Sequence, residues 1–314
     1  MTAGVAVLPL MGAAASATAA PPALPPPVAE RRSATIHAFA KPLQFLSYDD
    51  TAALIAEAGY GGVDYTVRPG GHVEPAKVAD DLPRAVAAAK KAGLAVEMIS
   101  TAITSARDKH TEPLLRTAAQ LGVKIYRYGA FTYDETLGIW PTLQKHRAAI
   151  QELAALNQSL GLHGAIQNHA GPRVGGPLWD LYELLRDVDP RWSGVQYDIR
   201  HAVAEGGQSW PLALRLLAPW IKSTDLKDFK WQQTSGKAVI ENVPLGEGIV
   251  PFEAYFKRVR ELQLSGPISV HFEYAPFEHA AKPLTGAEKR PRFLEAMKQD
   301  LAVLKRYLAA ARLG

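Results

Sequence analysis

Four short segments of this sequence end an apolar run with side chains that can bind a cation or move a proton. Their sequences are AIQNHAG at residues 165–171, VQYDIRH at 195–201, STDLKD at 223–228 and VHFEY at 270–274. Carboxylates, amide oxygens and imidazoles are groups that ligate divalent cations, and several of them also transfer protons in enzymes. Strands buried in a parallel sheet are otherwise apolar, so ionisable groups at four strand ends indicate a function.

The alternation of side chains along a strand groups these residues further, because residues two apart share a face. The pairs that share a face are Gln167 with His169, Asp225 with Lys227, and His271 with Glu273. Each residue alone also has a structural explanation, since an aspartate such as Asp198 caps helices and a core histidine is usually hydrogen-bonded. Polar side chains at four consecutive strand ends favour one shared site instead.

The segments that must position these residues repeat along the chain. The phrases EAGYGGVDYTV, KAGLAVEMIST, QLGVKIYRYGA and SLGLHGAIQNH each join a helix end, a glycine and a strand, which is typical of βα units. The glycines of these joints are Gly59, Gly93, Gly122 and Gly161, roughly 30 to 40 residues apart. Parallel strands joined by right-handed crossovers at this spacing predict an α/β fold, a single-domain (β/α)8 TIM barrel.

Eight strands are predicted for this barrel, with helices in the gaps between them. They are Thr35–Ala40, Gly62–Val67, Ala95–Thr101, Lys124–Ala130, His163–His169, Gly194–Ile199, Ile221–Lys227 and Pro267–Tyr274. The carboxyl ends of barrel strands meet in one bowl, so the polar strand ends would surround a common ligand. A doubly wound open sheet is the alternative, although no GxGxxG or GKS/T loop supports a nucleotide site. The segment Phe229–Gly248 is predicted to be a long loop that could act as a lid.

Composition excludes several classes of protein. Of 314 residues, 47% are hydrophobic and 21% charged, which predicts a globular protein with a large core. The net charge of +4 is small, and no basic stripe interleaved with aromatics indicates nucleic-acid binding. The absence of cysteine excludes disulfides, thiolate metal sites and cysteine nucleophiles, so a metal would have to bind through oxygen or imidazole.

Residues 1–32 differ in composition from the predicted barrel domain, residues 33–314. The stretch VAVLPLMGAAASATAAPPALPPP resembles a signal-peptide core and cleavage region, followed by a Pro-rich linker from Pro21 to Pro27. This pattern predicts export to the periplasm or outside the cell. The positively charged start of a signal peptide is missing, so a disordered leader is the alternative, and the run is too short and broken to predict stable membrane insertion.

With these motifs in place, the sequence resembles the sugar phosphate isomerase/epimerase family of xylose isomerase-like barrels, from about Thr35 to Leu308. The resemblance depends on an Asp-x-x-His element at Asp198 and His201, on a Lys-Asp pair that begins at Lys227, and on FEY around Glu273. Members of that family hold a divalent cation with Glu, Asp, His and Glu from strands five to eight. The equivalent places here are Gln167, Asp198, Asp225 and Glu273.

Two of these places depart from the family pattern, because Gln167 replaces a glutamate and Asp225 replaces a histidine. The resemblance implies a metal site made of Gln167, Asp198, Asp225 and Glu273. This set offers only oxygen, which favours Mg²⁺, Mn²⁺ or Ca²⁺ over zinc, with Mn²⁺ or Mg²⁺ the expected ion. His169 could instead turn inward and supply a nitrogen ligand.

The resemblance also implies a mechanism, in which family epimerases move a proton between two carboxylates and the substrate. An amide has no useful proton affinity, so Gln167 cannot serve as a base and Glu273 is the expected one. His169, His201 or Lys227 would be the acid. The side chains expected to bind substrate are Gln167, His169, His201, Lys227 and Arg127, and further contacts could come from Arg68 and Trp140.

Three functions follow as hypotheses from this reasoning. The first is a carbohydrate-active isomerase or epimerase that abstracts a proton next to a carbonyl with the help of a metal, on an unphosphorylated sugar if the protein is exported. The second is a lyase, either a dehydratase or an enzyme of keto-glycoside β-elimination. The third is a barrel that binds sugar without catalysis. An endonuclease IV-like activity is disfavoured because the His-rich zinc cluster is missing. The sequence identifies neither the sugar nor the number of subunits in a possible homo-oligomer.

Overall fold

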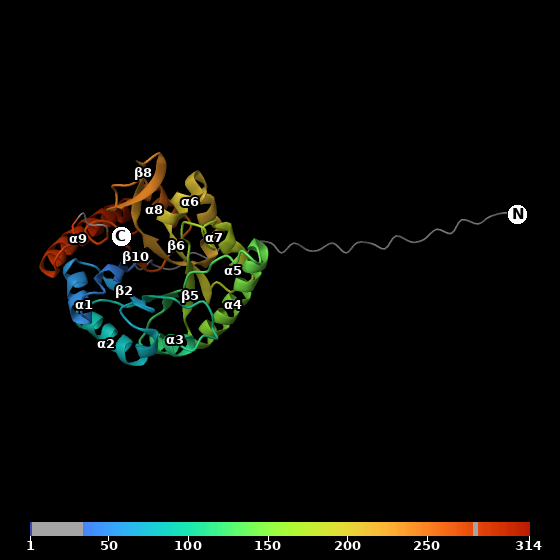
Figure 1. Ribbon diagram of the computed structural model, residues 1–314, viewed down its shortest axis with the longest axis horizontal. Coiled ribbons are helices and arrows are strands. Elements are labelled where there is room, and N and C mark those ends of the chain that lie inside the picture. Colours follow the sequence, from blue (N-terminus) through green and yellow to red (C-terminus); the bar gives the residue numbers. More distant parts are fainter. Residues whose placement is uncertain (2–33, 279–281) are drawn as a thin grey trace. The chain divides into compact units, whose positions relative to one another are not determined.

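Eight parallel strands close into a barrel in the computed structural model, which describes Met1 and residues 34–278 and 282–314 (Figure 1). Around the barrel each strand is hydrogen-bonded to the next one, and the last pairs with the first. The strands are β1 (Ile36–Phe39), β2 (Gly62–Val67), β3 (Met98–Thr101), β4 (Ile125–Arg127), β5 (His163–Gln167), β6 (Ser193–Asp198), β7 (Ile221–Leu226) and β10 (Ile268–Val270). The predicted (β/α)8 barrel is confirmed. The leader and linker predicted for residues 1–32 lie outside the described residues, apart from Met1.

Several strands are shorter than predicted at their carboxyl ends. The predicted strand Lys124–Ala130 pairs only over Ile125–Arg127, and the predicted strand Pro267–Tyr274 pairs only over Ile268–Val270. Beyond these points only single backbone hydrogen bonds continue, from the N–H groups of Tyr128, Gly129 and His271 to neighbouring segments. Residues after the last ladder bond therefore belong to loops, and the polar side chains there line a cavity.

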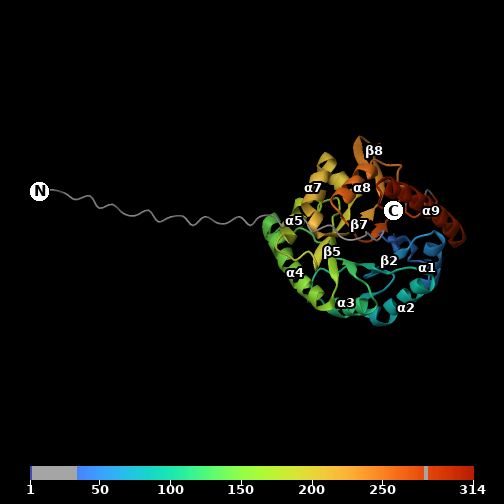
Figure 2. The same ribbon diagram turned by 180° about the vertical axis from the view of Figure 1, so that it is seen from behind.

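A ring of helices surrounds the strands and covers the outer face of the barrel (Figures 1 and 2). The helices are α1 (Tyr48–Glu57), α2 (Val78–Lys91), α3 (Thr111–Gln120), α4 (Ile139–Leu160), α5 (Trp179–Leu185), α6 (Ile199–Gly206), α7 (Trp210–Leu217), α8 (Phe252–Glu261) and α9 (Gly286–Ala310). Gly161 ends α4 in the left-handed region at φ 67°, where a side chain would be strained. The other three glycines of the repeated joints also have positive φ.

The prediction that Phe229–Gly248 is a loop was wrong, because most of this segment forms an antiparallel hairpin. Strands β8 (Asp228–Thr234) and β9 (Lys237–Val243) pair along their length and meet at Ser235 and Gly236, which both have positive φ. Two such residues between strands are typical of a tight hairpin turn. The Asp228 carboxylate anchors the base of the hairpin, where it accepts hydrogen bonds from the backbone N–H groups of Phe229, Gly246, Gly248 and Val250.

One buried carboxyl group lies between α9 and the end of the barrel. Asp300 accepts a hydrogen bond of 2.6 Å from the Tyr274 hydroxyl and one of 2.9 Å from the backbone N–H of Leu245. Burial raises the pKa of Asp300 to about 7, although these two hydrogen bonds act in the opposite direction.

Among the described helices, none is long and apolar enough to cross a membrane.

The raised pKa of Asp300 predicts how stability depends on pH. Between about pH 4 and pH 7 the folded chain holds this proton while the unfolded chain releases it, so the free energy of unfolding falls as pH rises, by at most about 4 kcal/mol. Asp300→Asn cannot ionise and should therefore flatten this dependence. Urea unfolding at pH 5 and pH 8 measures the effect, and the same slope in wild type and variant would contradict it.

Candidate active site

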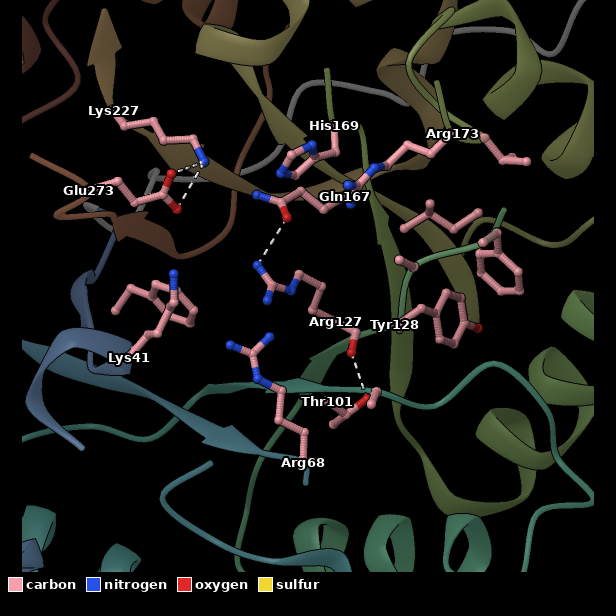
Figure 3. A pocket seen from close by; sticks show the side chains of 17 residues that line it. Lys41, Arg68, Thr101, Arg127, Tyr128, Gln167, His169, Arg173, Lys227 and Glu273 are labelled. Atoms are coloured by element: carbon pink, nitrogen blue, oxygen red, sulfur yellow. Dashed lines mark hydrogen bonds and ion pairs between the residues drawn. The ribbon is translucent and has the colours of Figure 1, made fainter. Parts of the chain in front are cut away.

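A cavity of about 250 Å³ opens at the carboxyl ends of the barrel strands (Figure 3). Seven of the eight strands contribute a side chain from their end or from the residues that follow. These side chains are Phe39, Arg68, Thr101, Arg127, Gln167, Lys227 and Glu273. The remaining barrel strand, β6, ends in Asp198, which is fully buried and lies outside the cavity lining. The cavity is therefore where the sequence predicted a common site.

A buried lysine connects two of the predicted site carboxylates. The Lys227 ammonium lies 3.2 Å from both Glu273 oxygens and 3.4 Å from Asp198 Oδ2. Burial alone would raise the pKa of Glu273, but the adjacent Lys227 ammonium, which also donates hydrogen bonds to it, and the nearby His271 ring hold it well below the ordinary value. Glu273 is therefore an ionised carboxylate that lines the cavity with part of its side chain exposed.

His271 lies beneath this pair and contacts a third carboxylate. Its Nε2 atom is 3.4 Å from Asp225 Oδ1, its Nδ1 atom is 3.7 Å from Glu273 Oε1, and its ring stacks on Phe39 with centroids 4.2 Å apart. Burial acts to lower the pKa of His271, but the nearby carboxylates, Asp225 first and then Glu273, raise it above the ordinary value. The protonated imidazole would thus offset part of the buried negative charge.

Gln167 connects the cavity to the buried aspartates. Its Oε1 atom accepts a hydrogen bond of 2.9 Å from Arg127, and its Nε2 group donates to Asp225 at 2.7 Å and to Asp198 at 3.0 Å. The arginine can only donate and the carboxylates can only accept, so these neighbours dictate which way the amide points. Gln196 also donates to Asp225, at 2.7 Å.

These hydrogen bonds affect whether the four residues implied by the resemblance can bind a divalent metal. The carboxylates of Asp198 and Asp225 are brought together at the strand ends, but their oxygens receive N–H groups from Gln167, Gln196 and Lys227. Gln167 presents a nitrogen donor to them, which cannot ligate a cation. Gln167 therefore cannot complete the implied set with Asp198, Asp225 and Glu273 in this arrangement, and Glu273 is paired with Lys227 instead.

A different group could hold a metal. One ligand atom each from Asp198, Asp225 and His271 lies within 4.8 Å of the others, and all three residues are buried. Sequence reasoning placed His271 on the same face as Glu273 but did not consider it as a ligand. The alternation in VHFEY was the available signal, because both residues follow β10 on one face.

The two predicted histidines have different positions. His169 lines the cavity, its Nδ1 atom lies 2.8 Å from the Ala170 carbonyl oxygen, and burial lowers its pKa to about 4. The Nδ1–H group donates to that carbonyl, so the neutral ring has its lone pair on Nε2. His201 is buried behind it with ring centroids 3.9 Å apart and does not line the cavity.

The Asp-x-x-His element has a structural role in addition to any chemical one. Asp198 is the N-cap of α6, and its side chain accepts a hydrogen bond from the backbone N–H of His201. The helix-cap explanation weighed from the sequence therefore holds. Trp140 on α4 is 64% exposed and lies away from the cavity lining, whereas Lys41 and Arg173, which line the cavity, were missed by sequence reasoning.

Comparison with known proteins agrees with the (β/α)8 barrel fold. The model of the xylose isomerase-like TIM barrel family matches residues 52–297, and a search of curated proteins found no match. An L-ribulose 3-epimerase structure superposes with a TM-score of 0.68 at 16% identity and covers 89% of this chain and 96% of that chain. A probable 3-DHS dehydratase from Bacillus anthracis gives 0.65 at 17%, covering 86% and 98%. A 3-keto-D-glucoside 4-epimerase from E. coli gives 0.62 at 16%, covering 87% and 99%.

The closed (β/α)8 barrel with a cavity at the carboxyl ends of its strands is a TIM-barrel protein. The chain belongs to the xylose isomerase-like TIM barrel family. The structural neighbours share the fold at identities too low to carry more than that.

Gln167→Glu tests the role assigned to the amide. The variant replaces an N–H donor with a third carboxylate facing Asp198 and Asp225, so we expect the free energy of unfolding to fall by about 3 kcal/mol. Mn²⁺ should restore part of that loss. Gln158→Glu, which makes the same change at an exposed site on α4, is the control for urea unfolding. An unchanged stability in Gln167→Glu would contradict the hydrogen-bonding role of the amide.

Proposed function

We propose that this protein is a carbohydrate-active isomerase or epimerase that abstracts a proton next to a carbonyl group, with Glu273 as the base. The observation that carries the proposal is the Glu273 carboxylate, which lines the cavity, is held ionised and lies 3.2 Å from the Lys227 ammonium. A base next to a cation is the arrangement that enolisation requires, because the proton leaves as negative charge develops on the carbonyl oxygen.

Lys227 is the group that would stabilise this negative charge. Its ammonium donates to Glu273 in the free protein. A substrate carbonyl that accepts one of these hydrogen bonds would draw Lys227 partly away from Glu273. This exchange would raise the proton affinity of the carboxylate at the moment when it must act as a base. The side chain thus supports both steps of the proposed reaction.

His169 is the second group available for proton transfer. Its neutral ring faces the cavity with an unprotonated Nε2, and Figure 3 shows Glu273, Lys227 and His169 directed into the same space. In an epimerisation Glu273 would remove the proton, and His169, after taking up a proton from water on Nε2, would return it to the opposite side of the carbon; Glu273 would release its proton to water. His201 lies too deep to contact a substrate in the cavity, so the proposal assigns it no proton transfer.

A lyase is the second candidate, and a specific observation favours it. Among the described residues that line the cavity, Glu273 is the only carboxylate, since Gln167 occupies the place of the second one. One base and one acid suffice to remove a proton and expel a β-substituent. Both candidates share the enolate, and NMR of the products separates them because elimination creates a carbon–carbon double bond.

The Mn²⁺ or Mg²⁺ predicted from the sequence is not used in this proposal. Such an ion would act as a Lewis acid, held by Asp198, Asp225 and His271, whereas Lys227 supplies the positive charge here. We expect EDTA to leave activity and melting temperature unchanged, and dialysed protein to contain substoichiometric metal by mass spectrometry. Activity that disappears with EDTA and returns with Mn²⁺ would contradict the proposed role of Lys227.

Glu273→Gln tests the base directly. With D-fructose, L-ribulose and methyl 3-keto-glucosides in D₂O, the wild type should exchange the hydrogen next to the carbonyl, and the variant should lose about 10²- to 10⁴-fold in rate. Glu241→Gln on the exposed hairpin is the matched control and should keep the wild-type rate. A wild type that binds these sugars without any exchange would support the non-catalytic, sugar-binding barrel instead.

A further inference from the structure

The cavity at the strand ends carries more positive than negative charge. Its basic lining residues are Lys41, Arg68, Arg127, Arg173 and Lys227. Two of them are neutralised, because Lys227 contacts Glu273 and Asp198 while Lys41 contacts Glu278 at 2.8 Å. The three arginines keep their charge without a carboxylate at ion-pair distance in residues 34–278 and 282–314.

Arg68 and Arg127 form the centre of this excess. Their guanidinium groups lie beside one another in the cavity, as Figure 3 shows. Arg127 packs over the Phe39 ring at 5.2 Å and donates only to the neutral amide of Gln167, whereas the side chain of Arg68 has no hydrogen bond within the described part of the chain. Burial, and next the charge of Arg127, lower the pKa of Arg68. Two like charges removed from water in this way attract an anion.

The buried carboxylate nearby does not cancel these charges. Asp64 acts electrostatically on both arginines, but it is fully buried and does not line the cavity. Its oxygens accept hydrogen bonds from Ser100 at 3.1 and 3.2 Å and from Ser269 at 2.9 Å. One carboxylate beneath two guanidinium groups leaves a net positive charge in the cavity, to which Arg173 on the loop after β5 adds.

We propose that Arg68 and Arg127 bind the carboxylate of a sugar acid, such as a uronate or a keto-aldonate, whose carbonyl end lies against Glu273 and Lys227. This inference rests on the function proposed above and names its substrate class. It narrows the unphosphorylated sugar expected from the sequence to one that carries a carboxylate. The N–H groups of a guanidinium form a planar fork that matches the two oxygens of a carboxylate.

The position of the arginines favours a carboxylate over a phosphate ester. Arg68 and Arg127 line the same small cavity as Glu273 and Lys227, and Arg127 is held in place by its hydrogen bond to Gln167, so the anion would lie within one sugar length of the reacting groups. A carboxylate is attached by one bond to the sugar carbon, whereas a phosphate ester extends its charge further from the ring. A cavity of about 250 Å³ is small for a ligand pocket and suits a single monosaccharide acid.

Calorimetric titration of the full chain with D-glucuronate, D-glucose and D-glucose 6-phosphate tests this inference. We expect D-glucuronate to bind most tightly and its affinity to fall as salt is added. Arg68→Gln should weaken D-glucuronate binding about 10- to 100-fold, because a charge-assisted contact is lost. Arg84→Gln removes an exposed arginine on α2 that pairs with Asp81, and it should bind D-glucuronate as wild type does.

Each contrary outcome overturns a definite part of the inference. Equal affinity for D-glucose and D-glucuronate would show that the arginines do not select an anion, and tighter binding of D-glucose 6-phosphate would overturn the assignment to a carboxylate. The proposed function fails separately. Exchange in neutral keto-sugars without selection of anions would support the enolising enzyme and contradict the sugar-acid substrate. Selective D-glucuronate binding with no exchange on any sugar acid would support the anion site and contradict the enolising enzyme.

Discussion

The site depends on the Lys227 ammonium, which lies between two carboxylates at the ends of different strands. It is 3.2 Å from Glu273, which follows β10, and 3.4 Å from Asp198, which ends β6. Buried carboxylates repel one another and take up protons unless a cation compensates them, and leaving a buried charge without its partner costs several kcal/mol. One lysine thus keeps the expected base ionised and lowers the free-energy cost of burying it.

The two departures from the family pattern fit each other in this structure. Gln167 stands where the resemblance implies a carboxylate, and Asp225 stands where it implies a histidine. The amide donates to Asp225 at 2.7 Å, so a donor faces an acceptor, as it would if a histidine faced a glutamate. Gln196 supplies a second donor to the same aspartate. The substitutions are therefore complementary, and the resulting network distributes charge among side chains of the protein itself.

A chain of hydrogen bonds connects the basic side of the cavity with its acidic floor. Arg127 donates to Gln167, which donates to Asp198, and Asp198 lies against Lys227. Such networks hold side chains in one arrangement, because every member would lose a partner if one of them turned away. The cavity consequently presents guanidinium groups on one side and a carboxylate–ammonium pair on another, which orients any ligand with unlike ends.

The sequence by itself determined the barrel and the strand ends at which polar residues gather, because glycine joints such as Gly161 and strand alternation follow local rules. The hairpin after β7 was also within reach, since Ser235 and Gly236 form a recognisable two-residue turn. The partners of each side chain were decided only by the tertiary structure. His271 lies against Asp225 because β7 and β10 are neighbours, and the Gln167 amide points its nitrogen at the aspartates because Arg127, 40 residues earlier in the chain, occupies its oxygen. Spacing along a chain specifies which face a residue occupies, whereas the donor or acceptor that it meets there depends on strands brought beside it by folding.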